Sequence, residues 1–577
     1  MLEHIQTDIL ILGSGGAGLF AALHAHAADP GLSITIATKG LLGKCGCTRM
    51  VQGGYNVALH AGDSVERHFM DTIEGGKWLP DQDLAWTLVQ TAIERVQELE
   101  NEIGCFFDRN ADGTLHGKAF AGQTFDRTVH KGDLTGIEII SRLMEQVWAK
   151  PAISRLEEHR ALGLIPARDK TRIAGVLMLD IRTGRFKFIQ AKAVLLATGG
   201  GPTMYRYHTP SGDKSMDGLA MALRSGLALR DMEMVQFHPT GLLAGQDTRM
   251  TGTVLEEGLR GAGGHLLDGR QRRFMEDYDP KLERATRDIV SRAIYAEMKA
   301  GRTTPHGGVY LRMSHLGPAM VAKKFKGMVD RCRDCGFDLA GGLVEVVPTA
   351  HYFMGGIVCA PDTSTAMPGL FVAGEDAGGV HGANRLGGNG VANSTVFGGI
   401  AGDVMPGWVA AHPTYCAPDE EVLEAELARA QYPFFKPPGD VYALRTALQD
   451  VMWDHVGVVR NAAGISQGLQ KIDEIEAKLL ETGVADHDRA FNLTWQDWLN
   501  LRSLLEISRV IAYAAQLRCN SRGAHYRADY PEPGDMMGSC YTLINYADGR
   551  LHLSEKPVMF TRIKPGESLL VQESITA

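Results

Sequence analysis

The hydrophobic pattern at the start of the chain predicts a strand, a glycine turn and a helix. Residues 9–12 form an unbroken apolar run typical of a buried strand, and an alanine- and leucine-rich segment follows it. Between them lie Gly13, Gly15 and Gly18, with the spacing G-x-G-x-x-G. The motif alone fits a small-residue helix start equally well, but a strand-like run at 32–37 completes a βαβ unit. The pattern therefore predicts a helix N-terminus presented to a pyrophosphate.

The pattern then alternates between helical and extended segments. Residues 64–147 are mostly helical, with a turn at 110–113, and residues 154–190 alternate like a small antiparallel sheet. A buried strand at 193–201 ends in glycines, where a backbone can approach a flat ligand. Residues 38–54 carry too many glycines for a regular element. We therefore expect them to form a loop near the dinucleotide.

In the second half of the chain the residue composition and the hydrophobic pattern change from one segment to the next. Residues 250–342 are rich in charge and poor in glycine, which indicates a separate mixed α/β insertion. Residues 345–402 return to the glycine-rich style of the first region. Apolar residues at helical spacing dominate 418–519, and short extended pieces with proline turns follow in 521–577. These shifts predict several structural units.

Composition and charge narrow the class of protein. A chain of 577 residues is too long for one core, and its 44% hydrophobic and 22% charged residues are ordinary for a globular protein. The net charge of −9, without a lysine or arginine block, argues against nucleic acid or an anionic membrane as a partner. There is no secretory signal pattern and no apolar run of membrane-spanning length. With nine cysteines, an odd number that fits reduced thiols, we expect a cytoplasmic protein without direct membrane insertion.

Several reactive residue types also have an ordinary structural explanation. The spacings C-x-C at 45–47 and C-x-x-C at 332–335 lack a second pair or a thioredoxin-like context, so no metal site is predicted. A lone histidine such as His238 is more often structural than catalytic. The charged residues between 256 and 288 fit surface salt bridges equally well. The acidic residue expected to bind a ribose after the second strand is absent, because Thr38 and Lys39 stand there.

Taken together, the motifs resemble one family, the flavoprotein subunits of succinate dehydrogenase and fumarate reductase, with L-aspartate oxidase as a sister group. They occur in the family order across almost the whole chain. The matching segments begin at the numbered residue and are GSGGAG (13), MVQGGYNVAL (50), ATGGGPTMY (197), MDG (216), QFHPTG (236), EGLRGAGG (257), RFMEDYDP (273), TRDIVSRA (286), PTAHYFMGGI (348), AGEDAGGVHGANRLGGN (373) and SRGAHYRADYP (521).

This resemblance implies an α/β fold with a doubly wound FAD-binding domain, an inserted α+β capping domain, a C-terminal helical bundle and a small tail domain. The implied boundaries are 1–240 plus 345–405 for the FAD-binding domain, 241–344 for the cap, 406–520 for the helical domain and 521–577 for the C-terminal domain.

The resemblance also implies FAD as the cofactor, with the adenine dinucleotide on the first glycine loop and the flavin wrapped by residues 38–54. Asp217 and Glu375 are expected to hold polar groups of the cofactor. The full set of implied FAD-binding residues is Gly13, Ser14, Gly15, Gly16, Ala17, Gly18, Thr38, Lys39, Cys47, Thr48, Gly53, Gly54, Thr198, Gly199, Asp217, Glu375, Asn389, Gly390 and Val391.

For the reaction, the resemblance implies hydride exchange between flavin N5 and one carbon of a small carboxylic acid, with proton exchange at the neighbouring carbon. Arg287 would donate or accept that proton, fed through Glu257 and Arg260. Arginine keeps its proton at ordinary pH, so this role needs a carboxylate beside it that resets the proton. The implied substrate-binding residues are His238, Thr240, Glu256, His351, Arg385 and Phe120.

Three positions depart from the family pattern. Cys47 stands where the respiratory subunits carry a histidine linked covalently to FAD, and Gly390 stands where serine is expected near the flavin. Glu256 replaces a threonine that contacts the substrate carboxylate in the family. An ionised Glu256 would repel succinate and fumarate, so either Glu256 is protonated or turned toward a cation, or the substrate carries a neutral or positive group there.

Three functions follow from the sequence. The favoured one is an FAD-dependent dehydrogenase or reductase that acts on a CH–CH or C=C bond of a small carboxylic acid. The second is an amino-acid oxidase similar to L-aspartate oxidase, and the third is a flavin electron-transfer subunit without a substrate. An iron–sulfur or other electron-transfer partner is expected for the first, and no nucleic acid for any of them.

Overall fold

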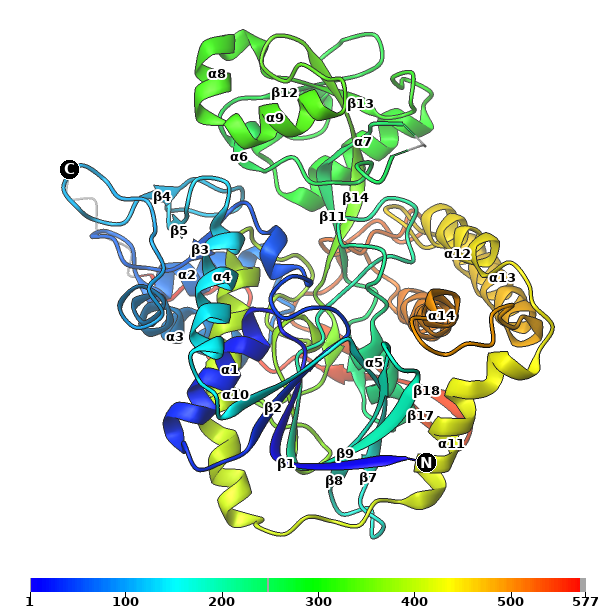
Figure 1. Cartoon of the computed structure of the whole chain (residues 1–577). Helices are drawn as coiled ribbons and strands as arrows, with labels where there is room; N and C mark the ends of the chain where they lie inside the picture. Colours follow the sequence, from blue (N-terminus) through cyan, green and yellow to red (C-terminus); the bar gives the residue numbers. More distant parts are fainter. Residues whose placement is uncertain (1, 246–247, 571–577) are drawn as a thin grey trace.

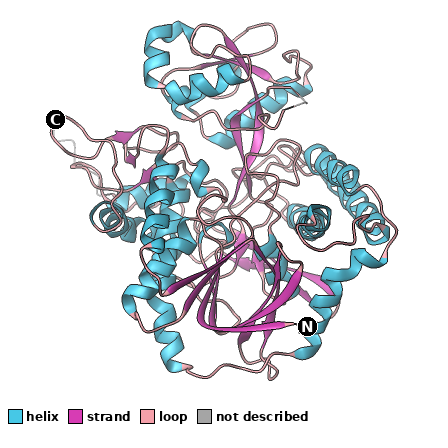
Figure 2. Cartoon of the chain, viewed as in Figure 1, coloured by secondary structure: helices cyan, strands magenta, loops and turns pink. Residues whose placement is uncertain are grey.

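The computed structural model describes residues 2–245 and 248–570. Met1, residues 246–247 of the predicted cap and residues 571–577 of the predicted tail domain lie outside the described residues. Figures 1 and 2 show a strand-rich base, a lobe above it and a group of helices at one side.

A seven-stranded sheet forms the base, and its central strand β1 pairs in parallel with both β2 and β9. β6 extends the parallel part beyond β2, and β16 pairs in parallel with the end of β9. β7 and β8 continue the sheet antiparallel to β9, so the alternating segment 154–190 belongs to the main sheet. The strands are β6 (Ile153–Glu157), β2 (Ile34–Thr38), β1 (Glu3–Leu12), β9 (Arg185–Leu196), β8 (Ile173–Asp180), β7 (His159–Pro166) and β16 (Leu370–Val372).

Two glycine- and alanine-rich helices, α1 (Gly16–Ala28) and α10 (Asn389–Ala411), pack against each other beside this sheet. They approach closely because α10 presents glycines to α1. A Cβ on Gly398 would lie 2.5 Å from Ala17 O, and one on Gly402 would lie 2.5 Å from Ala21 O. Both helices begin beside the carboxyl ends of the parallel strands, so their N-termini open toward the same side of the sheet.

Helices α2 (Val65–Gly75), α3 (Gln82–Asn101) and α4 (Thr135–Trp148) confirm the helical character of 64–147 only in part. The predicted turn at 110–113 is a much longer irregular segment between α3 and α4, with the short strands β4 (Gly117–Lys118) and β5 (Thr128–Val129). β5 pairs with β3 (Tyr55–Asn56). Glycines at positive φ at 104, 113, 122 and 132 interrupt the helical path.

The insertion forms the lobe at the top of Figure 1, and two antiparallel strands, β11 (Val235–Leu242) and β14 (Leu343–Phe353), run from the base into it. β13 (Val309–Arg312) and β12 (His265–Leu267) complete its sheet. Its apolar residues form a cluster of their own. Its helices are α6 (Gly258–Gly261), α7 (Arg287–Lys299), α8 (Pro318–Lys324) and α9 (Lys326–Asp334).

The helices at the side of the base come from the chain after α10. Trp495 and Trp498 of α14 are almost fully buried and belong to the large apolar cluster that also includes β7, β8 and β9. A hairpin of β17 (Cys540–Ala547) and β18 (Arg550–Pro557) pairs through β17 with the short strand β10 (Leu229–Arg230), and β10 pairs in turn with β15 (Gly356–Ile357). The helices are α11 (Glu420–Gln431), α12 (Val441–His455), α13 (Ala462–Glu481) and α14 (Leu493–Leu517), with α5 (Asp217–Arg224) packed on α14.

This arrangement is the fold class predicted from the sequence. Among the described residues, no helix combines the length and the apolar character that crossing a membrane requires.

Candidate active site

A connected cavity of about 450 Å³ lies where the glycine-rich loops of the base meet the cap. One end is lined by the turn between β1 and α1, and the other by cap residues that include Glu256, Glu257 and Arg287. The irregular segment between α3 and α4 contributes Phe120. The cavity therefore joins the predicted dinucleotide loop to the predicted catalytic residues.

The turn from β1 to α1 leaves the N-terminus of the helix open. Gly13 has φ of +116°, and a Cβ there would lie 2.0 Å from Ala197 O. Gly18 lies outside the cavity lining and packs the helix onto the turn, because its Cβ would lie 2.0 Å from Gly13 O. The N-cap residue Gly15 has no side chain to cap α1, and Gly16 N donates to Thr48 Oγ1 at 3.0 Å. Gly16 and Ala17 line the cavity. The other N–H groups of the first turn fit an anion such as a pyrophosphate.

The loop after β9 leaves room for a flat group. A Cβ on Gly199, at φ +77°, would meet no atom within 4 Å, although the residue lines the cavity. The neighbouring Thr198 is fixed by Asp376, whose carboxylate accepts from Thr198 Oγ1 at 3.0 Å and from Gly199 N at 3.1 Å. Burial raises the pKa of Asp376 to about 6. A rigid loop with open space beside it fits the FAD implied by the motifs.

Asp217 and Glu375 both line the cavity, in different electrostatic surroundings. Asp217 accepts from Lys39 Nζ at 3.0 Å and from Arg160 Nη2 at 2.8 Å. Although burial acts in the opposite direction, Arg160 and Lys39 hold the pKa of Asp217 far below its usual range. Burial raises the pKa of Glu375 to about 7, and its Oε1 accepts from Phe353 N at 2.9 Å.

The N-terminus of α10 forms another part of the wall. Gly388, Gly390 and Val391 line the cavity, and no side chain caps this helix. Asn389 points away from the cavity lining and binds Asn56 and Thr72, at 2.7 and 3.1 Å. A Cβ on Gly390 would lie 2.9 Å from Arg385 Nη1, so glycine at this position makes room for the arginine.

His238 on β11 and His351 on β14 face each other across the paired strands, with ring centroids 5.4 Å apart. Burial, together with Arg287 and Arg385 nearby, holds the pKa of both histidines well below 6.5. Both rings are therefore neutral at ordinary pH.

Each ring has a threonine on its Nδ1 nitrogen. Thr240 N donates to Nδ1 of His238 at 3.3 Å, and Thr209 Oγ1 lies 3.0 Å from Nδ1 of His351. An Nδ1 that accepts leaves the proton on Nε2, where it can be donated to a ligand. Thr240 does not line the cavity, whereas Thr209 does.

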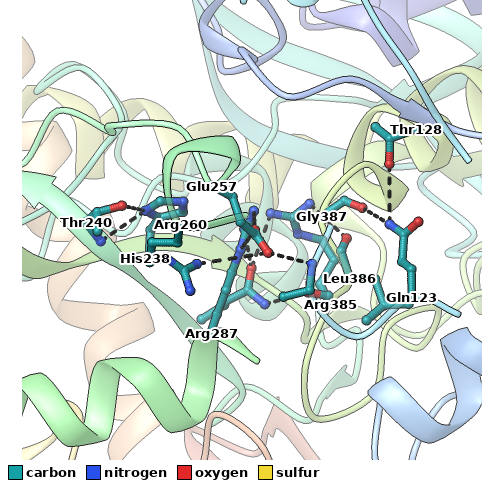
Figure 3. A network of polar contacts seen from close by, with 12 residues as sticks. Gln123, Thr128, His238, Thr240, Glu257, Arg260, Arg287, Arg385, Leu386 and Gly387 are labelled. Carbon is teal, nitrogen blue, oxygen red and sulfur yellow. Dashed lines mark hydrogen bonds and ion pairs between the residues drawn. The ribbon is translucent and has the colours of Figure 1, made fainter. Parts of the chain in front are cut away.

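Glu257 lies between Arg287 and Arg260 (Figure 3), and Gln236 joins Arg287 to Arg385. Arg287 donates from Nε to Glu257 Oε2 at 2.8 Å and from Nη1 to Gln236 Oε1 at 3.0 Å. Arg385 Nη2 donates to the same Gln236 oxygen at 3.2 Å. Arg260, which does not line the cavity, has Nη2 at 4.0 Å from Glu257 Oε1. The predicted relay residues therefore lie in one chain of contacts.

The charges in this network of arginines and Glu257 are not evenly balanced. Burial would raise the pKa of Glu257, but Arg287 and Arg260 outweigh it and lower the pKa. Arg385 has no carboxylate partner among the described residues, and burial lowers its pKa to about 10. Its guanidinium lies 4.3 Å from the ring centroid of Tyr352. A carboxylate that binds in the cavity thus has an uncompensated guanidinium available.

Two of the positions that depart from the family pattern also face the cavity. Burial raises the pKa of Cys47 to about 12, so its sulfur stays protonated. Glu256 is 4% exposed and lies 3.5 Å from Lys118 Nζ. Burial raises the pKa of Glu256 as well.

The other predicted FAD-binding residues lie together in the same wall. The remaining ones in the cavity lining are Ser14, Gly15, Thr38, Thr48, Gly53 and Gly54.

Several residues of the site were not predicted from the sequence. Thr209 and Lys118 act on predicted residues that are far away in the chain, and Arg160 sits in an ordinary strand pattern. No spacing in the sequence signals such contacts. Gln236 stands in a motif that was recognised, but its bridging role depends on geometry.

Comparisons with known proteins extend over almost the whole chain. The sequence matches the family described as FAD binding domain over residues 8–391, and the family described as fumarate reductase flavoprotein C-term over residues 445–569. It is 38% identical over 540 residues to one subunit of the fumarate reductase (CoM/CoB) of Methanothermobacter marburgensis, and the match covers 92% of this chain and 95% of that protein. An uncharacterized FAD-dependent oxidoreductase of Methanocaldococcus jannaschii is 41% identical over 532 residues, covering 92% and 94%.

Solved structures show the same similarity. FrdA of the quinol fumarate reductase of E. coli, in a form with one substitution, superposes with a TM-score of 0.91 at 32% identity, over 98% of this chain and 99% of that chain. Sdh1 of Mycobacterium smegmatis, in complex with UQ1, has a TM-score of 0.87 at 36% identity, over 97% and 95%.

Proposed function

Because the chain belongs to the fumarate reductase and succinate dehydrogenase flavoprotein family and is an FAD-dependent oxidoreductase, we propose that it exchanges a hydride between flavin N5 and a carbon–carbon bond of a small carboxylic acid. The observation that carries this proposal is the convergence of Arg287, Arg385, His238 and His351 on the cavity that also contains the glycine-rich loops. The bond is saturated or unsaturated according to the direction of the reaction.

In this proposal Arg385 binds a substrate carboxylate. Its guanidinium lacks a carboxylate partner among the described residues, and guanidinium groups match carboxylates through paired hydrogen bonds. Thr240 N donates to Nδ1 of His238, and in this proposal the Thr209 hydroxyl donates to Nδ1 of His351 in the same way, so that both rings donate from Nε2. Donors fixed before the substrate arrives stabilise negative charge as it develops on the carboxylate.

Arg287 transfers the proton. An arginine loses its proton only beside a base that returns it quickly, and Glu257 lies 2.7 Å from Arg287 Nη2. Arg260, with Nη2 at 4.0 Å from the other oxygen of Glu257, continues the chain away from the cavity. The low pKa of Glu257 keeps it ionised and ready to accept the proton from Arg287.

The cap excludes water from this step. Glu257 of the cap accepts from Ala121 N of the base at 3.1 Å, and Lys118 of the base pairs with Glu256 of the cap at 3.5 Å. These contacts hold the cap against the base beside the substrate end of the cavity. Removing water strengthens each charge interaction inside.

A direct test uses the FAD-loaded protein under anaerobic conditions. Flavin reduced with dithionite should be re-oxidised on mixing with fumarate or a related unsaturated acid, and an equal amount of saturated acid should form. Saturated analogues of the same acids serve as controls for non-specific re-oxidation. If no unsaturated acid re-oxidises the flavin and no saturated acid reduces it, the proposed function is wrong and a flavin electron-transfer subunit is the better explanation.

An amino-acid oxidase is the second candidate, favoured by the acidic Glu256 in the cavity wall. A carboxylate at that position suits the ammonium group of an amino acid. Aspartate-dependent release of hydrogen peroxide in air would identify this activity.

We also propose an electron-transfer partner and a cytoplasmic location. Relatives at 38% and 34% identity are named as subunits, one of a CoM/CoB fumarate reductase and one of an 8-methylmenaquinol:fumarate reductase. All nine cysteines are free, which fits a reducing compartment. Purification from its own cells, with identification of proteins that accompany it, tests both.

A further inference from the structure

Glu256 is a buried carboxylate in the cavity wall that lacks hydrogen-bond donors. Its side chain lies just before α6 and is 4% exposed. Oε2 is fully buried and has no hydrogen-bond partner among the described residues. Buried carboxylate oxygens in proteins are normally hydrogen-bonded. Oε2 lies toward Lys118, at 3.5 Å from its Nζ. Glu256 itself lines the cavity, and its other oxygen, Oε1, has no hydrogen-bond partner among the described residues either, so Oε1 is the acceptor that a ligand can reach.

Lys118 supplies positive charge to Glu256 but not a good hydrogen bond. Its Nζ lies 3.5 Å from Oε2, whereas it donates to Gly132 O at 2.6 Å. Arg331, a cap arginine in the same cavity wall, donates to Val254 O at 2.8 Å. The acceptor on Glu256 is thus left for a donor that the ligand brings.

The charges of the neighbouring groups suit a ligand with one carboxylate. Glu257 is tied to Arg287, so the positive charge of that arginine is balanced within the protein. Arg385 is left for one substrate carboxylate, and His238 and His351 are neutral. A second substrate carboxylate would share the cavity with the carboxyl group of Glu256, whose charge Lys118 offsets from a distance of 3.5 Å.

We propose that Glu256 selects substrates that carry a nitrogen-borne hydrogen-bond donor, an amine or an amide, in place of the second carboxylate of a plain dicarboxylate. This inference rests on the function proposed above and names its substrate class. The nitrogen donates to Glu256, while the remaining carboxylate binds Arg385. An amine brings a charge-assisted hydrogen bond and an amide a neutral donor, and the two are distinguished by the test.

The experiment compares matched acids on the FAD-loaded protein. The reducible pair is fumarate and its monoamide, and the saturated set is succinate, its monoamide and β-alanine, in which an ammonium group replaces one carboxylate of succinate. Re-oxidation of reduced flavin gives kcat/KM for the first pair, and perturbation of the oxidised flavin spectrum gives Kd for the saturated acids. The variants are Glu256→Thr and the isosteric Glu256→Gln. Glu276→Gln is the control, because Glu276 is a cap carboxylate whose side chain is 63% exposed.

We expect the native protein to prefer the monoamide over fumarate by about tenfold or more, the usual size of one hydrogen bond to a charged group. Glu256→Thr should reverse this preference, and Glu256→Gln should reduce it. Tighter binding of β-alanine than of succinamate would identify the amine, and the opposite order the amide. Glu276→Gln should change none of these values.

Equal use of fumarate and its monoamide by the native protein, unchanged in both Glu256 variants, would overturn the inference while leaving the proposed function intact. If the variants lose FAD, the Kd values of the native protein test the inference instead. Succinate that binds as tightly as both nitrogen-bearing acids would then overturn the inference. Flavin that reacts with none of the acids contradicts the proposed function itself, and this inference falls with it.

Discussion

At the scale of single residues, Arg287 is held by a carboxylate and an amide in an arrangement suited to proton transfer. General acid–base groups contribute roughly 10²- to 10⁴-fold to the rate. We therefore expect Arg287→Ala to lower kcat by about that range while FAD remains bound. Arg287→Lys should recover only part of the loss, because lysine lacks the planar fork that meets Glu257. Steady-state kinetics with matched flavin content measure this, and unchanged turnover in Arg287→Ala would exclude the role.

Thr209 positions a histidine that binds substrate. Its hydroxyl lies 3.0 Å from Nδ1 of His351, so Thr209→Val removes the hydroxyl and keeps the shape. We expect KM to rise by about tenfold, the loss of one oriented donor, and kcat to change less. Thr209→Ser retains the hydroxyl and should restore KM. A serine variant as weak as the valine variant would mean that packing, and not the tautomer of His351, is responsible.

Glu375 gives the unfolding free energy of the FAD-free protein a defined pH dependence. Its pKa rises from 4.5 to about 7 because the carboxyl is buried, so the native state binds more protons between these values. Its contribution to stability is complete below about pH 4.5 and is lost as the pH rises through about 7, a change of about 3 kcal/mol. Glu375→Gln should remove this dependence, because the amide stays neutral at every pH. Melting temperatures of the two proteins between pH 5 and 8 should therefore diverge most at the highest pH.

The sequence supplied most candidate residues of the site but not the contacts between them. Arg287, Glu257 and Arg385 stand in motifs, and the structure places all three in or beside one network. Thr209 is 142 residues away from His351, and no local pattern signals a hydrogen bond over that separation. The residue roles implied by the motifs stay predictions until they are tested by substitution.

At the scale of elements, two glycines in the turn between β1 and α1 serve different purposes, one for folding and one for ligand binding. A Cβ on Gly13 would lie 2.0 Å from Ala197 O at φ +116°, so Gly13→Ala should destabilise the base itself. A Cβ on Gly15 has its nearest neighbour at 3.5 Å, on Thr48 Oγ1. We expect Gly15→Ala to fold normally and to bind FAD at least tenfold more weakly, because the methyl group enters the space of the pyrophosphate. Circular dichroism and flavin titration distinguish the two variants.

The loop around Cys47 gives a second expectation at this scale. Its sulfur stays protonated because burial raises the pKa to about 12, and a thiol is a poor nucleophile. Acid precipitation of the yellow protein should therefore release FAD into the supernatant. Colour that stays with the pellet and is lost in Cys47→Ser would demonstrate a covalent link.

Periodicity predicted the long elements well and the irregular ones poorly. The apolar spacing at 441–456 and 498–517 corresponds to α12 and α14, because a buried helix face repeats regularly. The stretch between α3 and α4 was predicted as a short turn, but it is held by hydrogen bonds to residues distant in the sequence, such as Gln123 to Asn56 and Arg127 to Asp63, and these give no local pattern. The family, the fold class and the FAD-dependent oxidoreductase activity predicted from the motifs are confirmed by the comparisons.

At the scale of the whole molecule, residues of the base, the cap and the segment between α3 and α4 line one cavity. Lys39 of the base donates to both Asp217, the first residue of α5, and Asn500 of α14, and residues of the cap line the other end. A ligand at a thousandfold excess over its Kd stabilises the native state by about 4 kcal/mol. Removing FAD should therefore lower the melting temperature, and added FAD should restore it. An apoprotein that melts like the holoprotein would contradict this.

The cap leaves and rejoins the base through β11 and β14, two strands that are hydrogen-bonded neighbours. His238 and His351 stay on these strands, whereas Glu257 and Arg287 belong to the excursion between them. A lobe whose two ends lie side by side can be exchanged as a cassette. A chimaera could keep the base of this chain and carry the lobe of a relative. Its ligand-binding histidines would then come from one parent and its proton-transfer residues from the other. The architecture therefore allows affinity and turnover to diverge separately during evolution.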